Sequence, residues 1–210
     1  MKLELAGSYP RVHIGDGTPS FGGSQNWFPG ASFRACGCGV IACADTLLFL
    51  TGRRELTREE YLNYVNSIRR YFPLIPYRGI DGLRLAIGMN LCLLREGLPY
   101  TSRWSAASSL FWDRLAGQLE RNIPAIVAIG PNFPIVWGKE TLPLYRRTEN
   151  SCFEATRTRG HFLTVTGLDD EWMRVSSWGQ ELYISRGDYE RYRRENGTLL
   201  TSLLYITRNK

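Results

Sequence analysis

The chain has 210 residues, enough to bury a core of its own, and 43% of them are hydrophobic while 22% are charged, a balance that excludes a disordered chain. The formal charge is +6, but the basic residues are scattered in small groups, which favours a solvated face over a nucleic-acid groove. We therefore expect one globular domain with no nucleic-acid partner.

The chain carries no visible targeting signal. No apolar run approaches the length of a membrane span, and the first residues, MKLELAGSYPR, lack the apolar core of a signal peptide. Five cysteines without disulfide-scaffold spacing favour free thiols in a reducing compartment. We expect a cytoplasmic protein without a membrane span, a metal or another cofactor, with a trimmed export signal as the alternative.

The first half of the chain reads as an irregular arm followed by helices. Residues 1–35 are rich in Gly, Pro and Ser, which predicts an arm laid over a core. Thr57 and Glu60 form a capping box at the start of one predicted helix. Helical spacing of apolar residues predicts four helices, which end at Leu50 and span Arg58–Tyr71, Leu83–Arg95 and Ser108–Arg121.

The second half reads mainly as strands, because short apolar or alternating runs are separated by turn residues. The predicted strands are Ala125–Ile129, His161–Thr166, Trp172–Ser176, Glu181–Ile184 and Leu200–Thr207, with a Pro- and Gly-rich loop or hairpin up to Gly160 and a short helix at Asp188–Glu195. Helices followed by antiparallel strands indicate an α+β fold. We expect a single domain over 1–210, with an arm (1–35), a mainly helical part (36–122) and a mainly β part (123–210).

Two stretches contain candidate catalytic residues. The run CGCG, from Cys36 to Gly39, leads directly into the first helix and places a thiol at a helix N-terminus, where a thiolate is stabilised. His161 opens a predicted strand directly after Gly160, a position from which an imidazole can face a cleft as a general base. The other histidine, His13, lies in the arm and reads as a surface residue or filler.

At these two stretches the chain resembles the papain-like cysteine peptidases. GHFLTVTGL followed by SSWGQELYIS is similar to the family's second half, where a strand-opening His is followed by a hairpin ending in Asn-Ser-Trp-Gly. The Cys-Gly run before a small-apolar helix is closer to the bacterial branch that includes the double-glycine leader (bacteriocin-processing) peptidases. The resemblance covers residues 25–50 and 160–184, with a compatible element order between them.

The resemblance implies a papain-like fold with the Cys on a central helix and an antiparallel sheet in the C-terminal half. It also implies four site residues by position. Cys38 would be the nucleophile, His161 the general base, Gln25 the donor to the oxyanion, and Ser176 the residue that orients the His ring. The implied reaction is acyl transfer through a thioester, with a peptide or another amide as substrate.

Three departures from the family pattern leave alternatives open. Cys36 also stands before a Gly, although the helical periodicity begins after Cys38. Gln25 lies farther upstream of the Cys than is usual in the family, so Asn26 or backbone N–H groups alone are the other donors to consider. Ser176 replaces an Asn or Asp, and a hydroxyl cannot offset imidazolium charge as a carboxylate does.

We therefore predict a cysteine peptidase, or an amide hydrolase or acyl transferase, that uses Cys38 and His161. Two other classes remain open. One is a papain-like binding module whose catalytic site has been weakened. The other, less favoured, is a zinc protein, because only one close Cys pair exists. Its ligands would come from Cys36, Cys38, Cys43, Cys92, Cys152 and His161.

Overall fold

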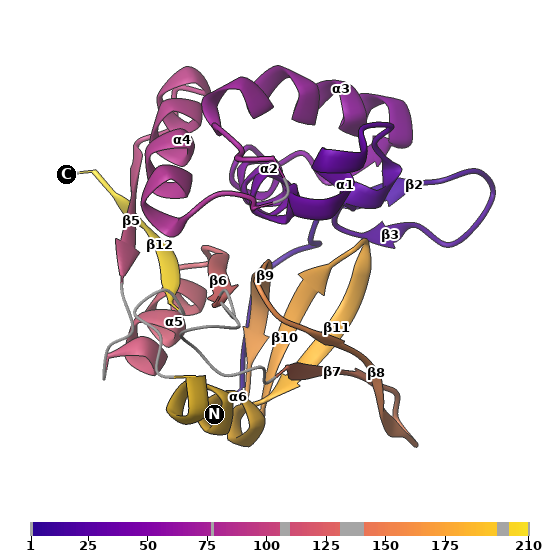
Figure 1. The fold of residues 1–210 in the computed structure, drawn as a ribbon, viewed down its shortest axis with the longest axis vertical. Helices are drawn as coiled ribbons and strands as arrows, with labels where there is room; N and C mark the ends of the chain where they lie inside the picture. Colours follow the sequence, from indigo (N-terminus) through magenta and orange to yellow (C-terminus); the bar gives the residue numbers. More distant parts are fainter. Residues whose placement is uncertain (1, 77, 106–109, 131–140, 197–201, 210) are drawn as a thin grey trace.

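The computed structural model describes residues 2–76, 78–105, 110–130, 141–196 and 202–209. Helices α1–α4 gather on one side, and most strands form one antiparallel sheet below them (Figure 1). The predicted α+β class with an antiparallel sheet is therefore confirmed, whereas the number of domains stays a prediction.

The predicted helices are present with small changes at their ends. The helices are α1 (Ala31–Cys36), α2 (Cys38–Leu50), α3 (Arg58–Ile68), α4 (Gly82–Arg95), α5 (Phe111–Glu120) and α6 (Arg186–Asn196). Short 3-10 turns span Gln25–Trp27 and Arg69–Tyr71. The capping box at Thr57 and Glu60 is formed in both directions, which confirms that prediction. Residues 106–109, part of the predicted fourth helix, lie outside the described residues.

The described residues form more strands than the sequence predicts. They are β1 (Leu3–Glu4), β2 (Arg11–His13), β3 (Ser20–Phe21), β4 (Glu55–Thr57), β5 (Tyr100–Ser105), β6 (Ala125–Ile129), β7 (Leu142–Arg147), β8 (Cys152–Thr158), β9 (His161–Leu168), β10 (Trp172–Ser177), β11 (Gln180–Ser185) and β12 (Leu203–Arg208). The predicted irregular arm therefore contains short strands and most of helix α1, and β4 and β5 lie inside the part predicted to be mainly helical. Residues 131–140, in the predicted loop or hairpin, lie outside the described residues.

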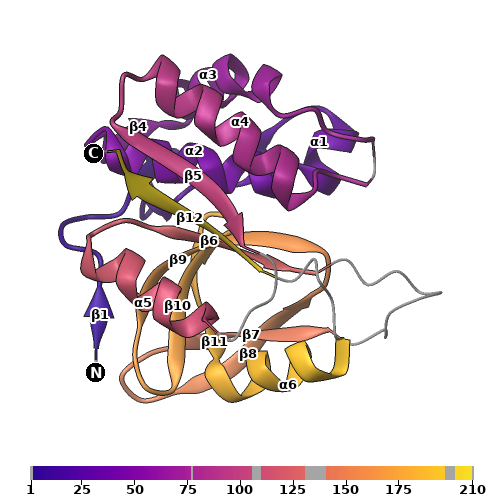
Figure 2. The ribbon, with the colours of Figure 1, turned by 90° about the vertical axis from the view of Figure 1, so that its left-hand side faces the viewer.

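Among the described residues, nine strands form the large sheet in the order β5-β12-β6-β9-β10-β11-β7-β8, with β1 also paired to β9. The two faces of β6 pack into different cores because side chains alternate along a strand. Ile126 packs with α2, α3 and α4, whereas Val127 and Ile129 pack with α5 and α6. Figure 2 shows the first group of helices above the strands, and α5 and α6 beside the lower strands.

Helix α2 is buried from Gly39 to Phe49 between α3, α4 and the sheet. An α-helix that is hydrophobic on all sides belongs in a core, and the run of Val40, Ile41, Leu47 and Leu48 fits that position. Cys38, the first residue of α2, lies at the start of this buried run and is itself partly exposed.

Within the described residues, no helix is long and apolar enough to cross a membrane. The cytoplasmic location stays a prediction.

Candidate active site

Cys38 is the first residue of α2, and glycines on both sides bring it there. The chain passes from α1 to α2 at Gly37, whose N–H donates to the carbonyl of Phe33 at 2.7 Å. A Cβ at position 37 would lie 2.6 Å from that oxygen, so the tight junction requires glycine. At Gly39 a Cβ would lie 3.2 Å from the ring of Phe162, which brings the start of α2 close to β9.

His161 is the first residue of β9 and pairs with Ile129 at the end of β6. Gly160 has a φ of +63°, a conformation that turns the chain sharply into the strand. The His161 side chain is 6% exposed, so the ring is almost completely out of solvent. The predicted position of this histidine at a strand end is therefore correct.

Cys38 and His161 line one small cavity of about 10 Å³, roughly the space of one water molecule. Its other lining residues come from the arm, α2, β9 and the β10–β11 turn. They are Gly23, Gln25, Ile41, Ala42, Asp45, Phe162, Ser176, Ser177 and Trp178. The fold thus brings together the four residues that the sequence singled out, Cys38, His161, Gln25 and Ser176.

The electrostatics of the cavity favour neutral forms of both central groups. Burial raises the pKa of the Cys38 thiol to about 11, and hydrogen bonds from the backbone of Phe162 and Gly39 offset part of that rise. Burial lowers the pKa of His161 to about 3. Near pH 7 the thiol is therefore protonated and the imidazole neutral, and the thiolate that the sequence predicts at this helix start is not stabilised.

Trp178 covers one face of the His161 ring. The two rings are stacked with centroids 4.3 Å apart and planes 18° apart. Trp178 has a φ of 51° and Gly179 a φ of 74°, the positive pair that a tight two-residue turn between β10 and β11 requires. A non-glycine residue in this region is strained, and the turn that imposes this conformation places the indole against the imidazole.

The structure pairs the His161 ring with Ser177 instead of Ser176. The Nε2 atom of His161 lies 2.6 Å from the Oγ of Ser177. Ser176 donates its hydroxyl to the carbonyl of Phe21 at 2.9 Å. Consecutive strand residues point to opposite sides, so only one of the two serines can reach the ring. The contact predicted for Ser176 is thus corrected to Ser177, which the family spacing did not single out.

Gln25, which the resemblance singles out as the oxyanion donor, lies beside the small cavity. It is 5% exposed, opens the 3-10 turn after the cap residue Ser24, and lines the cavity beside Cys38. Its side-chain amide makes no hydrogen bond to another described residue. Asn26, the alternative donor, is exposed and does not line this cavity.

The other thiols stand apart from the small cavity. Cys36 borders a neighbouring pocket, and its Sγ donates to the carbonyl of Ser32 at 2.8 Å. Cys43 and Cys92 are fully buried in the core, and Cys152 is exposed on β8. Among the described residues, no group of three or more His, Cys, Asp or Glu side chains could hold a metal ion. The ligands weighed for zinc are therefore not gathered at one point.

Asp45 is a site residue that the sequence reading did not identify. It lies seven residues after Cys38 on α2 and is 2% exposed. Its carboxylate accepts a hydrogen bond from Tyr61 at 2.7 Å and from the backbone N–H of Gly23. Burial raises its pKa to about 7, and the bonds from Tyr61 and Gly23 oppose that rise. The sequence feature that could have identified Asp45 is its place as an acidic residue inside an otherwise apolar helical run.

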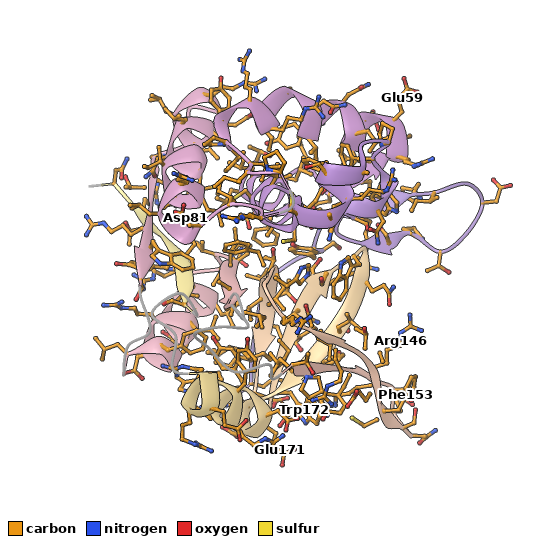
Figure 3. The ribbon with its side chains drawn as sticks, viewed as in Figure 1. Glu59, Asp81, Arg146, Phe153, Glu171 and Trp172 are labelled. Carbon is orange, nitrogen blue, oxygen red and sulfur yellow. The ribbon has the colours of Figure 1, made fainter. Side chains whose placement is uncertain are left out.

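Two larger pockets flank the small cavity. One, of about 350 Å³, is bordered by Cys38, His161, Phe162, Ile80 and Asp81 and is mainly apolar. The other, of about 510 Å³, extends from Trp178 along β11, β7 and β8. Figure 3 shows Asp81 of the first pocket and Arg146 and Phe153 of the second on opposite sides of the molecule. A chain that crossed the Cys38–His161 pair could therefore occupy space on both sides of it.

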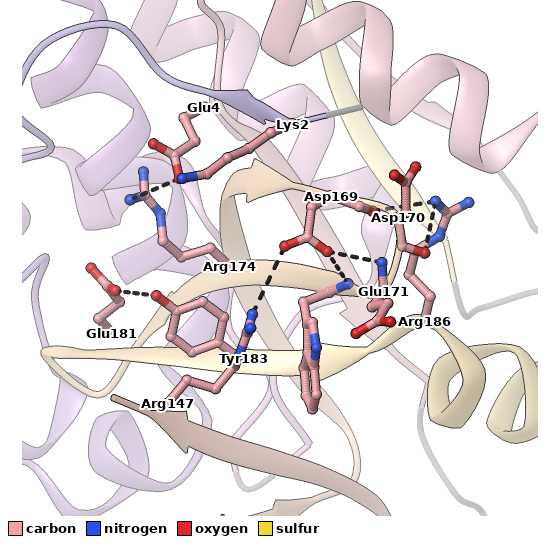
Figure 4. Close-up of polar contacts among 11 residues, drawn as sticks. Lys2, Glu4, Arg147, Asp169, Asp170, Glu171, Arg174, Glu181, Tyr183 and Arg186 are labelled. Carbon is pink, nitrogen blue, oxygen red and sulfur yellow. Dashed lines mark hydrogen bonds and ion pairs between the residues drawn. The ribbon is translucent and has the colours of Figure 1, made fainter. Parts of the chain in front are cut away.

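A third cavity, of about 580 Å³, lies at the opposite end of β9 from His161. Figure 4 shows that its charged side chains pair with one another. Glu4 lies 3.2 Å from Lys2 and 3.7 Å from Arg174, and Arg147 lies 3.8 Å from Asp169. Because these ion pairs are solvent-accessible and balanced in charge, the cavity offers no clear preference for one ligand class.

No protein-family model matches the chain, and no curated protein matches it. A crystal structure from Bacillus anthracis, described as a C39-like peptidase, is similar at 13% sequence identity over 83% of this chain and 90% of that one, with a TM-score of 0.49. A likeness of this strength assigns neither a family nor an activity to the chain.

Proposed function

We propose that this protein is a cysteine peptidase, or a related amide hydrolase or acyl transferase, with Cys38 as nucleophile and His161 as general base. The single observation that carries the proposal is the meeting of a helix-start thiol, a strand-start imidazole and the amide of Gln25 in one cavity. Nucleophile, base and oxyanion donor are the groups that acyl transfer needs.

The hydrogen bond at Nε2 supports a specific proton path. If Nε2–H donates to Ser177, then Nδ1 is the nitrogen left to accept the proton of the Cys38 thiol. The sulfur would attack the substrate carbonyl carbon and form a C–S bond, while the oxyanion accepts from the Gln25 amide. Collapse to the thioester would break the C–N bond, and His161 would return the proton to the leaving amine. Water, or another nucleophile, would then release the acyl group.

The pKa directions favour a path in which proton transfer and attack occur together. The raised pKa of Cys38 and the lowered pKa of His161 disfavour a thiolate–imidazolium pair before substrate arrives. The two flanking pockets favour an extended substrate, such as a peptide, over a small isolated amide.

The test is cleavage of a mixture of synthetic peptides of diverse sequence, followed by mass spectrometry. Wild type should generate new peptide ends, and both Cys38→Ala and His161→Ala should abolish them. Cys152→Ala, at an exposed thiol on β8, should cleave at the wild-type rate. Equal cleavage by Cys38→Ala would overturn the proposal, and so would saturable peptide binding without any cleavage, which the non-catalytic binding module predicts.

A further inference from the structure

Asp45 holds the backbone that leads into Gln25. Both oxygens of its carboxylate accept from the N–H of Gly23, at 3.1 and 3.0 Å, two residues before Gln25. The hydroxyl of Tyr61 on α3 also donates to the carboxylate, at 2.7 Å, and the hydroxyl of Tyr9 interacts with it as well. Among the described residues, no Lys, Arg or His forms an ion pair with Asp45. A buried acid without a cation is expensive to keep, so its bonds to the arm must be structurally important.

Backbone and side-chain hydrogen bonds hold the segment Phe21–Gly23, which leads into Gln25. The N–H of Phe21 donates to Gly179 at 2.9 Å, and the N–H of Gly22 donates to Pro10 at 2.8 Å. The hydroxyl of Ser176 fixes the carbonyl of Phe21. The hydrogen bond from Gly23 to Asp45 is the last of these contacts before the 3-10 turn that begins at Gln25.

Two adjacent glycines make this close approach possible. A Cβ on Gly22 would lie 2.4 Å from both the carboxylate of Asp45 and the hydroxyl of Ser176. A Cβ on Gly23 would lie 1.9 Å from the hydroxyl of Tyr61. The backbone can contact the carboxylate only without side chains at these two positions, so the glycine pair and Asp45 form one unit.

We propose that Asp45 is a positioning residue for the Gln25 amide: by binding the N–H of Gly23, it sets where the oxyanion donor lies relative to the sulfur of Cys38. This inference rests on the proposed acyl-transfer function. It predicts that loss of Asp45 affects reactions that pass through an oxyanion and spares reactions of the same thiol that do not.

The position of Asp45 also gives the site a pH dependence. The titratable groups around its carboxylate are Tyr61 on α3, Tyr9 after β1, and Cys38 and His161, which line the same small cavity. Burial raises the pKa of both tyrosines above 10 and that of Cys38 to about 11, and it lowers the pKa of His161 to about 3, so all four stay neutral near pH 7. The uncharged groups that face it are the N–H of Gly23 and, across Gly22, the hydroxyl of Ser176. Ionisation of Asp45, with a pKa of about 7, would strengthen its acceptance from Gly23.

The experiment compares two probes of Cys38 in the full chain. In acylation by p-nitrophenyl acetate, the sulfur bonds to the acetyl carbon through an oxyanion, p-nitrophenolate leaves with the electron pair, and the thiol proton passes to His161. Alkylation by iodoacetamide displaces iodide from carbon and forms no oxyanion. The ratio of the two rates removes the effect of Cys38 ionisation, which is common to both probes.

Gln25→Ala should lower the acylation-to-alkylation ratio by about 100-fold or more, as loss of an oxyanion donor does. Asp45→Ala should lower it by about 10- to 100-fold, since misplacement of a catalytic group by one ångström has an effect of that size. In the Gln25→Ala background, Asp45→Ala should cause no further loss. Asp16→Asn, at an exposed turn acid, is the matched control and should keep the wild-type ratio.

Asp45→Asn keeps the shape of the side chain and removes its titration. The wild-type ratio should rise from pH 6 to pH 8 with a midpoint near 7, and that of Asp45→Asn should be flat. Equal losses of acylation and alkylation in Asp45→Ala, a full additional loss in the Gln25→Ala background, or the same pH profile in wild type and Asp45→Asn would overturn this inference alone. Absence of acylation at Cys38 in wild type, or no effect of Gln25→Ala, would overturn the proposed function and this inference with it.

Discussion

The Nε2 atom of His161 lies 2.6 Å from the Oγ of Ser177, while Ser176 is bonded to the arm. A hydroxyl can fix the ring orientation, but it supplies no negative charge to stabilise an imidazolium. The proton-accepting strength of His161 should therefore depend on position 177 and be largely insensitive to position 176.

Substitution of Ser177 tests this relationship. Ser177→Ala removes an acceptor that stabilises the protonated ring, so it should lower the alkylation rate of Cys38 at pH 7 by about 2- to 10-fold. Ser177→Asp places a negative charge beside the ring, which favours the imidazolium and should raise the rate. The rate is measured by mass spectrometry of Cys38 after iodoacetamide treatment. Ser176→Ala should leave the alkylation rate of Cys38 at pH 7 unchanged, and a fall in rate equal to that of Ser177→Ala would contradict the assignment.

The pH dependence of Cys38 alkylation follows from burial of the thiol. Its pKa of about 11 means that the thiolate is scarce at pH 7 and becomes more abundant with every unit up to that value. Alkylation at pH 7 should be slower than that of free cysteine by about 10-fold or more, even though a more basic thiolate is more nucleophilic. The rate should climb without a plateau between pH 6 and pH 9. A fast plateau below pH 8 would instead indicate a preformed thiolate–imidazolium pair.

Asp45 should make the stability of the protein fall as pH rises. Its pKa is raised from 3.8 to about 7 in the folded state, so between those values the unfolded chain ionises while the folded protein retains the proton. The corresponding loss in free energy of unfolding is roughly 4 kcal/mol between pH 4 and pH 7, with little further change above. Urea unfolding measures the free energy of unfolding of wild type and Asp45→Asn at each pH. The difference between the two proteins at each pH gives the contribution of Asp45 ionisation. A difference that does not change with pH would show that Asp45 ionises normally.

Gly23→Ala should disturb the arm and the site together. The added methyl group would lie 1.9 Å from the hydroxyl of Tyr61, so either the tyrosine or the backbone before Gln25 must shift. We expect a loss of about 1 to 3 kcal/mol in free energy of unfolding, as for other overpacked positions, with reduced acylation of Cys38. Gly17→Ala is the control, because its added carbon meets only an ordinary contact at 3.8 Å. Equal stability of the two variants would contradict the packing around Asp45.

Periodicity and capping were sufficient to predict most of the helices and strands. The capping box at Thr57 marks the start of α3, and the apolar run Ala125–Ile129 coincides with β6. Strand β5 was missed for a physical reason. Its most buried residues, Ser102 and Ser105, are polar, and Ser102 is satisfied by the side chain of Asn90 instead of by apolar packing. An alternation of hydrophobic residues, the usual signal of a strand, is therefore absent.

Some of the site residues could likewise be predicted from the sequence, and others could not. Cys38, His161 and Gln25 stand at element starts, where turn glycines and short motifs mark them, and they line one cavity. Ser177 depends on which of two adjacent serines turns toward the ring, and a spacing comparison cannot resolve a difference of one residue on a strand. Asp45 is identified only by its tertiary contacts with Gly23 and Tyr61, which lie 22 and 16 residues away.

The most direct test of the account is the identity of the residue that forms the thioester. Wild type treated with p-nitrophenyl acetate, quenched in acid and mapped by mass spectrometry should carry one acetyl group on Cys38, formed far more slowly in His161→Ala. Cys36→Ala should still be acetylated at Cys38. An acetyl group on Cys36, or an acetylation rate of Cys38 that does not depend on His161, would contradict the assignment of nucleophile and base.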